Sequence, residues 1–488
     1  MFLKAGALSL ALLLASRLLG LVRESAQAAA FGTSGLADVV VLMLTLPDWL
    51  AGVLASGALA YVLVPAWAGQ GSAQVAQTQR NVGRALVLGG AVLALLLLVG
   101  RRPAVAWLAS GLPAAMQPAA AHAMVWSALA LPAALLAALW TTRLQHERDF
   151  TGMYSANLVV NAVLIAAISS ATTRAAAGRA IPWLGVGLLS AMLLRLAWLR
   201  WRTPAPQSTA EASGGQAARL PAPPVWLWAV LSAGLPLALP FAARSIASQA
   251  GEGALATFNY AWKLVELPLI LAIQLVATLA FPAIARSLAA GDTAGSAGAV
   301  RAALALAWAL ACAAAATLLF GAPAIAQLLF GWGRMQPAAL ARVAQWGAIG
   351  AWGLLPQALI AVALTVLAAR GRMRVAVMAY AAALGLLLAY AASGPNDGAA
   401  LMVLLNVLLG AVALAVLGAI GKDALAWLPW RSMAISLVCL LALAGLGMQG
   451  WFALPGIWLG LALAAVAGLA VMAATWFGSA DLRAALAR

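Results

Sequence analysis

Apolar segments about 20 residues long follow one another from end to end of the chain, separated by short polar loops. As a helix, each is long enough to cross the ~30 Å hydrocarbon core of a bilayer. The pattern therefore predicts an all-α polytopic membrane protein with about fourteen transmembrane helices. The predicted spans are 6–31, 38–64, 84–100, 120–141, 151–171, 181–199, 225–247, 254–285, 299–321, 338–368, 373–393, 399–421, 432–449 and 452–478.

The longest polar insert, residues 202–224, is rich in Pro, Ser, Gly and Ala, as is typical of flexible linkers. It lies between the sixth and seventh predicted spans. The second span of each half also ends alike, with Val-Pro-Ala at 64–66 and Phe-Pro-Ala at 281–283, as in an internal repeat. We therefore predict two six-helix lobes followed by two more helices. The predicted parts are an N-lobe at 1–201, a cytoplasmic linker at 202–224, a C-lobe at 225–422 and the last two helices at 423–488.

Composition and charge support a membrane protein. The chain is 65% hydrophobic and 8% charged, with a mean hydropathy of +1.00, whereas soluble domains carry about 25% charged residues. The net charge of +16 comes mainly from short loops, so it predicts no nucleic-acid partner. With the N-terminus inside, 17 of the 28 Lys and Arg residues fall on the cytoplasmic side, six on the opposite side and five within spans. This excess predicts both termini in the cytoplasm, in a phospholipid bilayer.

A small group of ionisable residues lies inside or at the ends of the first, second, seventh and eighth spans. A charge at the bilayer centre costs about 2.5–3.5 kcal/mol on insertion scales, so it persists only beside a partner or a wet cavity. We predict that these residues line a polar chamber between two halves of the protein. They are Arg17, Arg23, Glu24, Asp38, Asp48, Arg244, Lys263 and Glu266.

The first span carries three of these charges. Arg17 and Glu24 are seven residues apart and share nearly the same helix face, whereas Arg23 points about a third of a turn away. A simpler interpretation is that only Arg17 is buried, while Arg23 and Glu24 reach towards an interface. Three charges in one span nevertheless exceed what packing requires.

The charges of the second and eighth spans also allow simpler interpretations. Lys263 and Glu266 stand at i and i+3, so they can neutralise each other as a structural ion pair or open to bind an anionic headgroup. Asp38, near the start of its span, can complement the helix dipole. Asp48 follows Pro47, which frees a backbone carbonyl and permits a kink.

The sequence offers no catalytic or metal-binding motif. It contains no GxxxxGK[ST] phosphate loop, and its two histidines and two cysteines (Cys312 and Cys439, both in apolar segments) have no metal-ligand spacing. We predict a transporter rather than an enzyme, with no cofactor. Active transport would draw on a sodium or proton gradient, the membrane potential, or consumption of the product.

Two stretches resemble the MurJ/MviN family of lipid II flippases. The first is Ser-Arg-Leu-Leu-Gly-Leu-Val-Arg-Glu at 16–24, followed by Phe-Gly at 31–32, Ala-Asp at 37–38 and Leu-Pro-Asp at 46–48. The second is Asn-Tyr-Ala-Trp-Lys-Leu-Val-Glu-Leu-Pro at 259–268. The resemblance implies two six-helix lobes around a cationic central cavity, with the last two helices forming a groove for a lipid tail. It also implies a bacterial inner membrane and peptidoglycan biosynthesis. The family's cavity residues correspond to Arg17, Arg23, Asp38 and Glu266.

The chain departs from the family pattern at several cavity positions. Ala51 and Gly52 replace basic residues, and Ser56 replaces an acid. Trp262 replaces the usual acid before Lys263, which itself stands where the family usually has arginine. Loss of guanidinium groups removes bidentate donors to phosphate oxygens. The departures indicate a divergent member and leave open a lipid-linked glycan other than lipid II as its cargo.

The resulting prediction is a flippase for an undecaprenyl-pyrophosphate-linked saccharide, either lipid II or a related lipid-linked glycan, acting by alternating access. Its predicted partners are that glycan lipid, the bilayer, and proteins of cell-wall or polysaccharide synthesis. Two alternatives stay open: a flippase for an exopolysaccharide or O-antigen repeat unit, and a proton- or sodium-coupled small-molecule antiporter of the same superfamily. Arg17, Arg23, Arg244 and Lys263 are predicted to bind the diphosphate. Glu24, Asp38, Asp48 and Glu266 are predicted to gate or balance charge.

Overall fold

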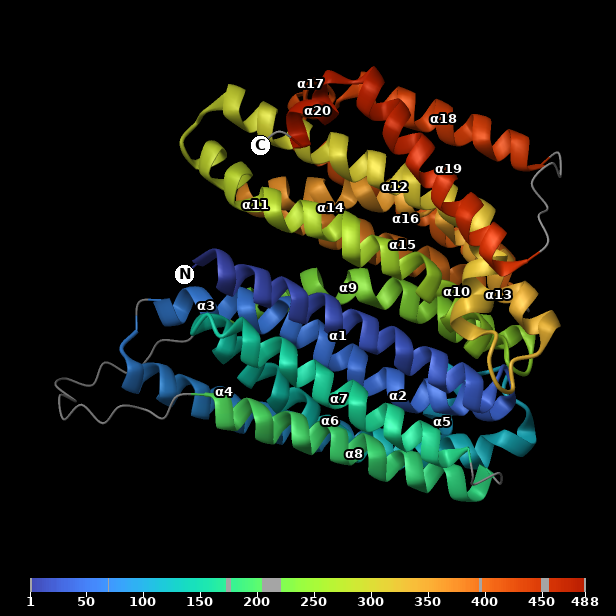
Figure 1. Ribbon diagram of the computed structural model, residues 1–488. Helices are drawn as coiled ribbons and strands as arrows, with labels where there is room; N and C mark the ends of the chain where they lie inside the picture. Colours follow the sequence, from blue (N-terminus) through green and yellow to red (C-terminus); the bar gives the residue numbers. More distant parts are fainter. Residues whose placement is uncertain are drawn as a thin grey trace. The chain divides into compact units, whose positions relative to one another are not determined.

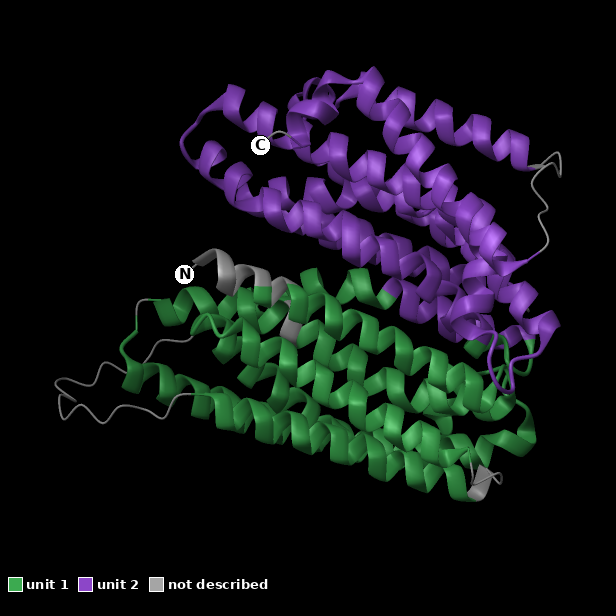
Figure 2. Ribbon diagram, viewed as in Figure 1, with its two compact units in different colours: residues 1–238, 251–256 green, residues 239–250, 257–488 purple. Residues whose placement is uncertain are grey.

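The chain is described by a computed structural model over residues 2–68, 70–172, 177–203, 221–394, 397–448 and 456–486, and this part contains helices but no β-strand (Figure 1). It divides into two compact units (Figure 2): residues 1–238 with 251–256, and residues 239–250 with 257–488. The division falls within α9, and the lobes predicted around 202–224 stay a prediction. Residues 204–220 of that insert lie outside the described part.

The first unit contains the helices of the N-terminal half and the beginning of α9. Their bounds are α1 (Phe2–Phe31), α2 (Gly35–Val53), η1 (Leu54–Ala58), α3 (Leu59–Ala68), α4 (Ser72–Val99), α5 (Arg101–Leu108), η2 (Ala114–Met116), α6 (Gln117–His146), α7 (Phe150–Ala171), α8 (Ala177–Arg202) and α9 (Pro223–Ala247).

The second unit contains the end of α9, most of α10 and the remaining helices. Their bounds are η3 (Ser248–Ala250), α10 (Ala254–Pro268), η4 (Leu269–Ile273), α11 (Gln274–Ala289), α12 (Thr293–Phe330), α13 (Pro337–Ala351), α14 (Leu354–Ala369), α15 (Met373–Ala391), α16 (Gly398–Ile420), α17 (Asp423–Trp427), α18 (Trp430–Met448), α19 (Ile457–Gly478) and α20 (Ala480–Leu486).

The helices confirm the predicted membrane class. Within the described residues, twelve helical segments are long and apolar enough to cross a bilayer, and α13 with α14, bent by 47°, makes a thirteenth. The 30-residue helix α1 corresponds to the first predicted span. The span boundaries were less accurate than their number, because α4 begins at Ser72, twelve residues before its predicted start.

The kink expected at Pro47 has a specific partner. A proline has no N–H, so Pro47 leaves the carbonyl of Met43, four residues earlier, without its helical donor. The hydroxyl of Ser127 on α6 donates to that carbonyl at 2.7 Å, and Ser127 is fully buried. The interruption of α2 is thus compensated by the neighbouring helix, as buried backbone groups in a membrane require.

The second span of each half contains a π-helical segment. Leu54–Ala58 joins α2 to α3, and Leu269–Ile273 joins α10 to α11. Each is followed a few residues later by the prolines at 65 and 282 noted in the sequence. π-segments locally widen a helix and are frequent at functional sites. This shared break strengthens the indication of an internal repeat.

Small residues allow close helix packing in the second unit. The long helix α12 contacts α19, and a Cβ placed on Gly460 of α19 would lie 2.8 Å from the Cβ of Ala324. Gly321 of α12 faces Ala464 in the same way. Lipid tails are as apolar as the helix surfaces, so the hydrophobic effect does little to bring helices together in a membrane. Close contacts between small residues favour helix association instead. Exposed side chains of α18 and α19 include apolar ones, such as Val438 on α18 and Val466 and Leu469 on α19. A lipid-tail groove there stays a prediction.

An ion pair forms in the first unit at the start of α7. Asp149 is the N-cap of α7, and its carboxylate accepts from the N–H of Gly152 at 2.9 Å. The guanidinium of Arg202, at the end of α8, binds the same carboxylate through two N–H groups at 3.0 and 2.9 Å. Partial burial acts to raise the pKa of Asp149, but the bonds from Arg202 and Gly152 outweigh it and hold this pKa below its usual range.

Because its pKa is lowered by folding, ionised Asp149 contributes stability above about pH 4, and the contribution is lost as the pH falls through the folded value. Asp149→Asn keeps an oxygen for Gly152 but loses the charge facing Arg202. We expect it to lower stability at pH 7 by less than about 1 kcal/mol, since Arg202 is partly solvent-exposed. Unfolding in detergent from pH 7 to pH 3 should show the two proteins converging below about pH 4. A constant difference over that range would contradict this assignment.

Candidate functional site

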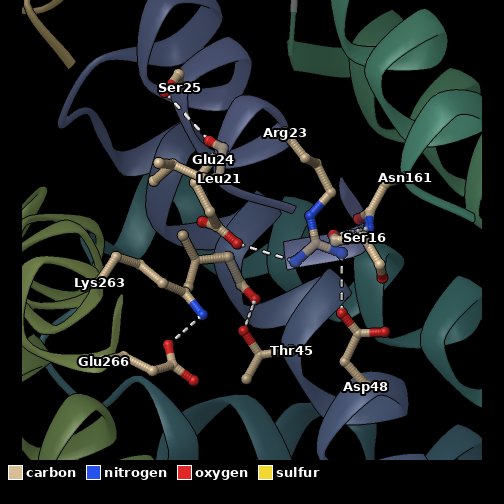
Figure 3. Close-up of polar contacts among 11 residues, drawn as sticks. Ser16, Leu21, Arg23, Glu24, Ser25, Thr45, Asp48, Asn161, Lys263 and Glu266 are labelled. Atoms are coloured by element: carbon tan, nitrogen blue, oxygen red, sulfur yellow. Dashed lines mark hydrogen bonds and ion pairs between the residues drawn. The ribbon is translucent and has the colours of Figure 1, made fainter. Parts of the chain in front are cut away.

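The guanidinium of Arg23, near the end of α1, joins two carboxylates of the first unit (Figure 3). Its Nη2 donates to Glu24 Oε1 at 2.9 Å, and its Nη1 donates to Asp48 Oδ2 on α2 at 3.0 Å. The Arg23 side chain is 13% exposed, that of Glu24 is 8% exposed, and that of Asp48 is 35% exposed. The three side chains therefore form an ion cluster that keeps one open side.

The structure reverses the simpler interpretation of the first span. Arg17 is exposed, whereas Arg23 is largely buried and Glu24 is buried. The heptad spacing indicated that Arg17 and Glu24 share a face, but Glu24 pairs with its sequence neighbour Arg23. A long arginine side chain can turn towards an adjacent residue, so helical spacing alone did not predict the pairing. Arg17 acts electrostatically on Tyr154 of α7.

Asp48 directly follows Pro47 within α2. Pro47 is buried and marks the point where α2 loses one of its own hydrogen bonds. Two residues before Pro47, the hydroxyl of Thr45 donates to the Val41 carbonyl at 2.6 Å. Asp48 thus projects from an irregular part of the helix towards Arg23, as Figure 3 shows.

A second arginine of the first unit was not among the predicted site residues. Arg195 lies within α8, is 9% exposed, and interacts electrostatically with Asp48. Its Nε has no hydrogen-bond partner among the described residues. The signal was present in the sequence, because Arg195 is a charge inside an apolar span. It stood outside the four spans where the other charges cluster.

Asp38 caps a helix start, but not that of its own helix. Its two carboxylate oxygens accept from the backbone N–H groups of Gly253 and Ala256, each at 2.7 Å, where α10 begins. The N-terminus of α2 is capped instead by Ser34, and Glu252 accepts from the N–H of Gly35 at 2.8 Å. The loop before α10 and the start of α2 therefore exchange carboxylate caps. This corrects the expectation that Asp38 serves the dipole of its own helix alone.

Asp38→Ala is expected to lower the stability of the protein by about 2 kcal/mol, because it leaves two buried N–H groups without their acceptor. Glu252→Ala removes only the bond to Gly35, in a more exposed place, so its effect should be smaller. Thermal unfolding of both variants in the same detergent measures the difference. Equal stability of Asp38→Ala and the unmodified protein would refute the capping role.

The second unit holds its own ion pair. Lys263 Nζ donates to Glu266 Oε2 at 2.6 Å within α10, which confirms the predicted i, i+3 pairing (Figure 3). Both side chains are about a quarter exposed, and Asn259, one turn before Lys263, is buried. Arg244 is half-buried in the last turn of α9. Whether these residues bind substrate stays a prediction.

These groups can bind and exchange charge, but nothing in their arrangement supports covalent chemistry. Arginine stays protonated in proteins and presents a planar set of donors that fits phosphate oxygens. A carboxylate beside it can hold the guanidinium until an anion competes for it. In the described residues, no group of three or more His, Cys, Asp or Glu side chains is placed to hold a metal ion. A cavity of about 630 Å³ between α12 and α13 contains none of the predicted site residues.

Comparison with known proteins identifies a family and a fold. The profile of the family described as lipid II flippase MurJ matches residues 27–477. A solved structure of lipid II flippase MurJ in an inward closed conformation has a TM-score of 0.76 to this chain, with 14% identity over 96% of this chain and 98% of that one. An inward-facing multidrug resistance MATE family transporter of the MOP superfamily gives a TM-score of 0.69, with 12% identity over 84% and 95%.

A MOP superfamily transporter from Pyrococcus furiosus gives a TM-score of 0.60, with 13% identity over 87% of this chain and 96% of that one. No curated protein sequence gives a significant match. At these identities, the similarity to solved structures shows the fold alone.

Proposed function

The chain belongs to the MurJ family of lipid II flippases, and from this premise we propose that it moves an undecaprenyl-pyrophosphate-linked saccharide across the bacterial cytoplasmic membrane by alternating access. We place both termini in the cytoplasm, on the Lys and Arg distribution. The glycan lipid is either lipid II or a related intermediate. Proteins of cell-wall or polysaccharide synthesis would supply or consume it.

The observation that carries the proposal is the buried cation Arg23 held between two carboxylates. A transport site must bind its cargo and then release it, so a permanently free cation would hold a diphosphate too tightly, and a fully neutralised one would not attract it. Arg23 is preorganised by Glu24 and Asp48, and one carboxylate of the pair keeps a third of its surface exposed. An incoming diphosphate can therefore compete for the guanidinium with charge-assisted hydrogen bonds.

A second candidate cargo follows from the composition of α2. Ala51 and Gly52 stand where the family has basic residues, and Ala51 is buried. A diphosphate in this protein would meet fewer guanidinium groups than lipid II meets in the family pattern. The alternative cargo is a lipid-linked repeat unit of an exopolysaccharide or O-antigen, which shares the diphosphate–prenyl part with lipid II and differs from it in the saccharide. A small-molecule antiporter of the same superfamily is the remaining alternative.

The test is flipping in vesicles that contain the purified protein. Fluorescent lipid II and a fluorescent lipid-linked polysaccharide repeat unit are compared, and the probe that reaches the far leaflet is quenched by a reagent that does not cross the membrane. We expect flipping of at least one glycan lipid and none of an uncharged prenol. Efflux of an organic cation with no flipping of either glycan lipid would disprove the flippase and support the small-molecule antiporter.

The assignment of cations is tested in the same vesicles with Arg17→Ala, Lys263→Ala and the double variant. Arg372→Ala and Lys422→Ala are matched controls, since both residues are exposed and lie outside the predicted site. We expect the site variants to slow flipping at least tenfold, as for loss of charged hydrogen bonds worth ~1.5–3 kcal/mol, with the controls unchanged. Unchanged flipping by a well-folded double variant would remove Arg17 and Lys263 from the site.

Energy coupling is proposed to come from a sodium or proton gradient or from the membrane potential. Vesicles with an imposed sodium gradient, an imposed pH gradient or a potassium diffusion potential distinguish the three sources. Flipping that is insensitive to all of them would leave consumption of the product as the driving force.

A further inference from the structure

Arg195 lies on the buried stripe of α8. The fully buried side chains of Leu188 and Met192 precede it, and that of Leu199 follows it, at the three- and four-residue steps that define one face of a helix. The stripe faces the interior of the first unit, so the Arg195 side chain extends into that interior. Arg195 stands seven residues before the end of α8, about 10 Å along the helix axis.

A buried arginine inside an apolar span is energetically unfavourable by itself. Its desolvation is costly unless a carboxylate or an ordered set of acceptors compensates it. In the described part of the chain, Arg195 Nε has no hydrogen-bond partner, and no carboxylate oxygen lies within ion-pair distance of Arg195. The carboxylate that acts on it electrostatically is Asp48. Helices α2 and α8, which carry the two residues, are in contact.

Asp48 therefore interacts with two arginines, Arg23 through an ion pair and Arg195 electrostatically. Arg23 Nη1 holds one of its oxygens at 3.0 Å, and Arg195 attracts it from α8 without reaching it. With Glu24, the group contains two cations and two anions. If Arg23 turned to an anionic ligand, Asp48 would be left as an uncompensated carboxylate beside a diphosphate, unless a second cation took it.

We propose that Arg195 is a positioning residue that takes over Asp48 when Arg23 releases it to bind the diphosphate of the cargo. The proposal rests on the proposed function, because it assigns the exchange to a diphosphate lipid. In the absence of cargo, Asp48 restrains Arg23. With cargo bound, Arg23 holds the diphosphate and Arg195 neutralises Asp48, so the cluster keeps its charge balance in both states.

The experiment measures binding of undecaprenyl pyrophosphate to the full-length protein in lipid nanodiscs. Arg195→Met removes the second cation, and we expect binding to weaken about tenfold, within the range for residues coupled in one ion network. Adding Asp48→Asn to Arg195→Met should restore binding to within about threefold of the unmodified protein, because residue 48 then carries no charge that Arg23 would leave uncompensated when it turns to the diphosphate. Arg195→Lys keeps a charge and should retain most of the affinity.

Two controls separate an exchange of partners from a general effect of charge. Glu24→Gln in the Arg195→Met background removes the same amount of negative charge, and it should not restore binding. Arg179→Met removes an exposed arginine of α8 and should leave the affinity unchanged. Unfolding of each variant in detergent shows that it is folded, and removal of an unpaired buried charge is not expected to destabilise the protein.

Several outcomes overturn the proposal. Arg195→Met with unchanged affinity removes Arg195 from the site. Failure of Asp48→Asn to restore binding shows that Arg195 contacts the anion itself or only supports the fold. If Glu24→Gln restores binding as well as Asp48→Asn does, the affinity depends on the net charge of the cluster and not on an exchange of partners by Asp48.

Flipping by the unmodified protein, measured separately, tests the proposed function. A protein that binds undecaprenyl pyrophosphate with the expected coupling but flips no glycan lipid disproves that function alone. If the unmodified protein does not bind this lipid, both are disproved.

Discussion

Arg23→Met is expected to destabilise the protein by about 3 kcal/mol and to abolish flipping. Removing one partner of a buried ion pair costs about 3–5 kcal/mol, because the remaining charge stays buried without compensation. Here it removes the cation that both Glu24 and Asp48 contact, so the repulsion between these two carboxylates is no longer offset by Arg23. The value belongs at the lower end of that range, since Asp48 is 35% exposed and can be hydrated.

The matched control is Arg17→Met, on the same helix but exposed, which should change stability by less than about 0.5 kcal/mol. Thermal unfolding in one detergent measures both. Arg23→Met combined with Asp48→Asn should recover part of the lost stability, because the repulsion between the carboxylates of Glu24 and Asp48 is then gone. If the single variant were as stable as the unmodified protein, the ion cluster would not stabilise the first unit.

The membrane helices could be predicted from the sequence because each apolar run has to satisfy its own backbone in lipid. The positions at which these helices are interrupted could not be predicted. Leu54–Ala58 and Leu269–Ile273 are apolar throughout or nearly so, and nothing in their composition distinguishes a π-helical segment from an α-helical one. Likewise, Pro47 predicted a freed carbonyl, but which hydroxyl would bind it depended on the packing of α6 against α2.

The candidate site was predictable as a set of charged residues and not as a set of pairs. The i, i+3 spacing predicted the contact between Lys263 and Glu266, because both lie on one helix. Arg23 and Asp48 are 25 residues apart on different helices, so their pairing required the tertiary fold. The partners of Asp38, which are the N–H groups of Gly253 and Ala256, could also be identified only from the structure.

Gly253→Ala is expected to destabilise the protein by about 3 kcal/mol, through two effects that add. Gly253 has φ = +78°, in the left-handed region that favours glycine. A Cβ at this position would also overlap the backbone carbonyl oxygen of Thr33, which cannot rotate away as a side chain can. The backbone would have to shift, and the shift would weaken the bond from the Gly253 N–H to Asp38.

Gly251 provides a control two residues away. Its φ is +111°, but nothing lies within 4 Å of a Cβ placed there. Gly251→Ala therefore carries only the conformational cost, ~1–2 kcal/mol, and it leaves Asp38 its two donors. Thermal unfolding of the two variants in one detergent separates the contributions. If Gly253→Ala cost no more than Gly251→Ala, the close approach of Thr33 would not stabilise this loop. The carboxylate cap of α10 would then tolerate displacement, and Asp38→Ala should prove correspondingly mild.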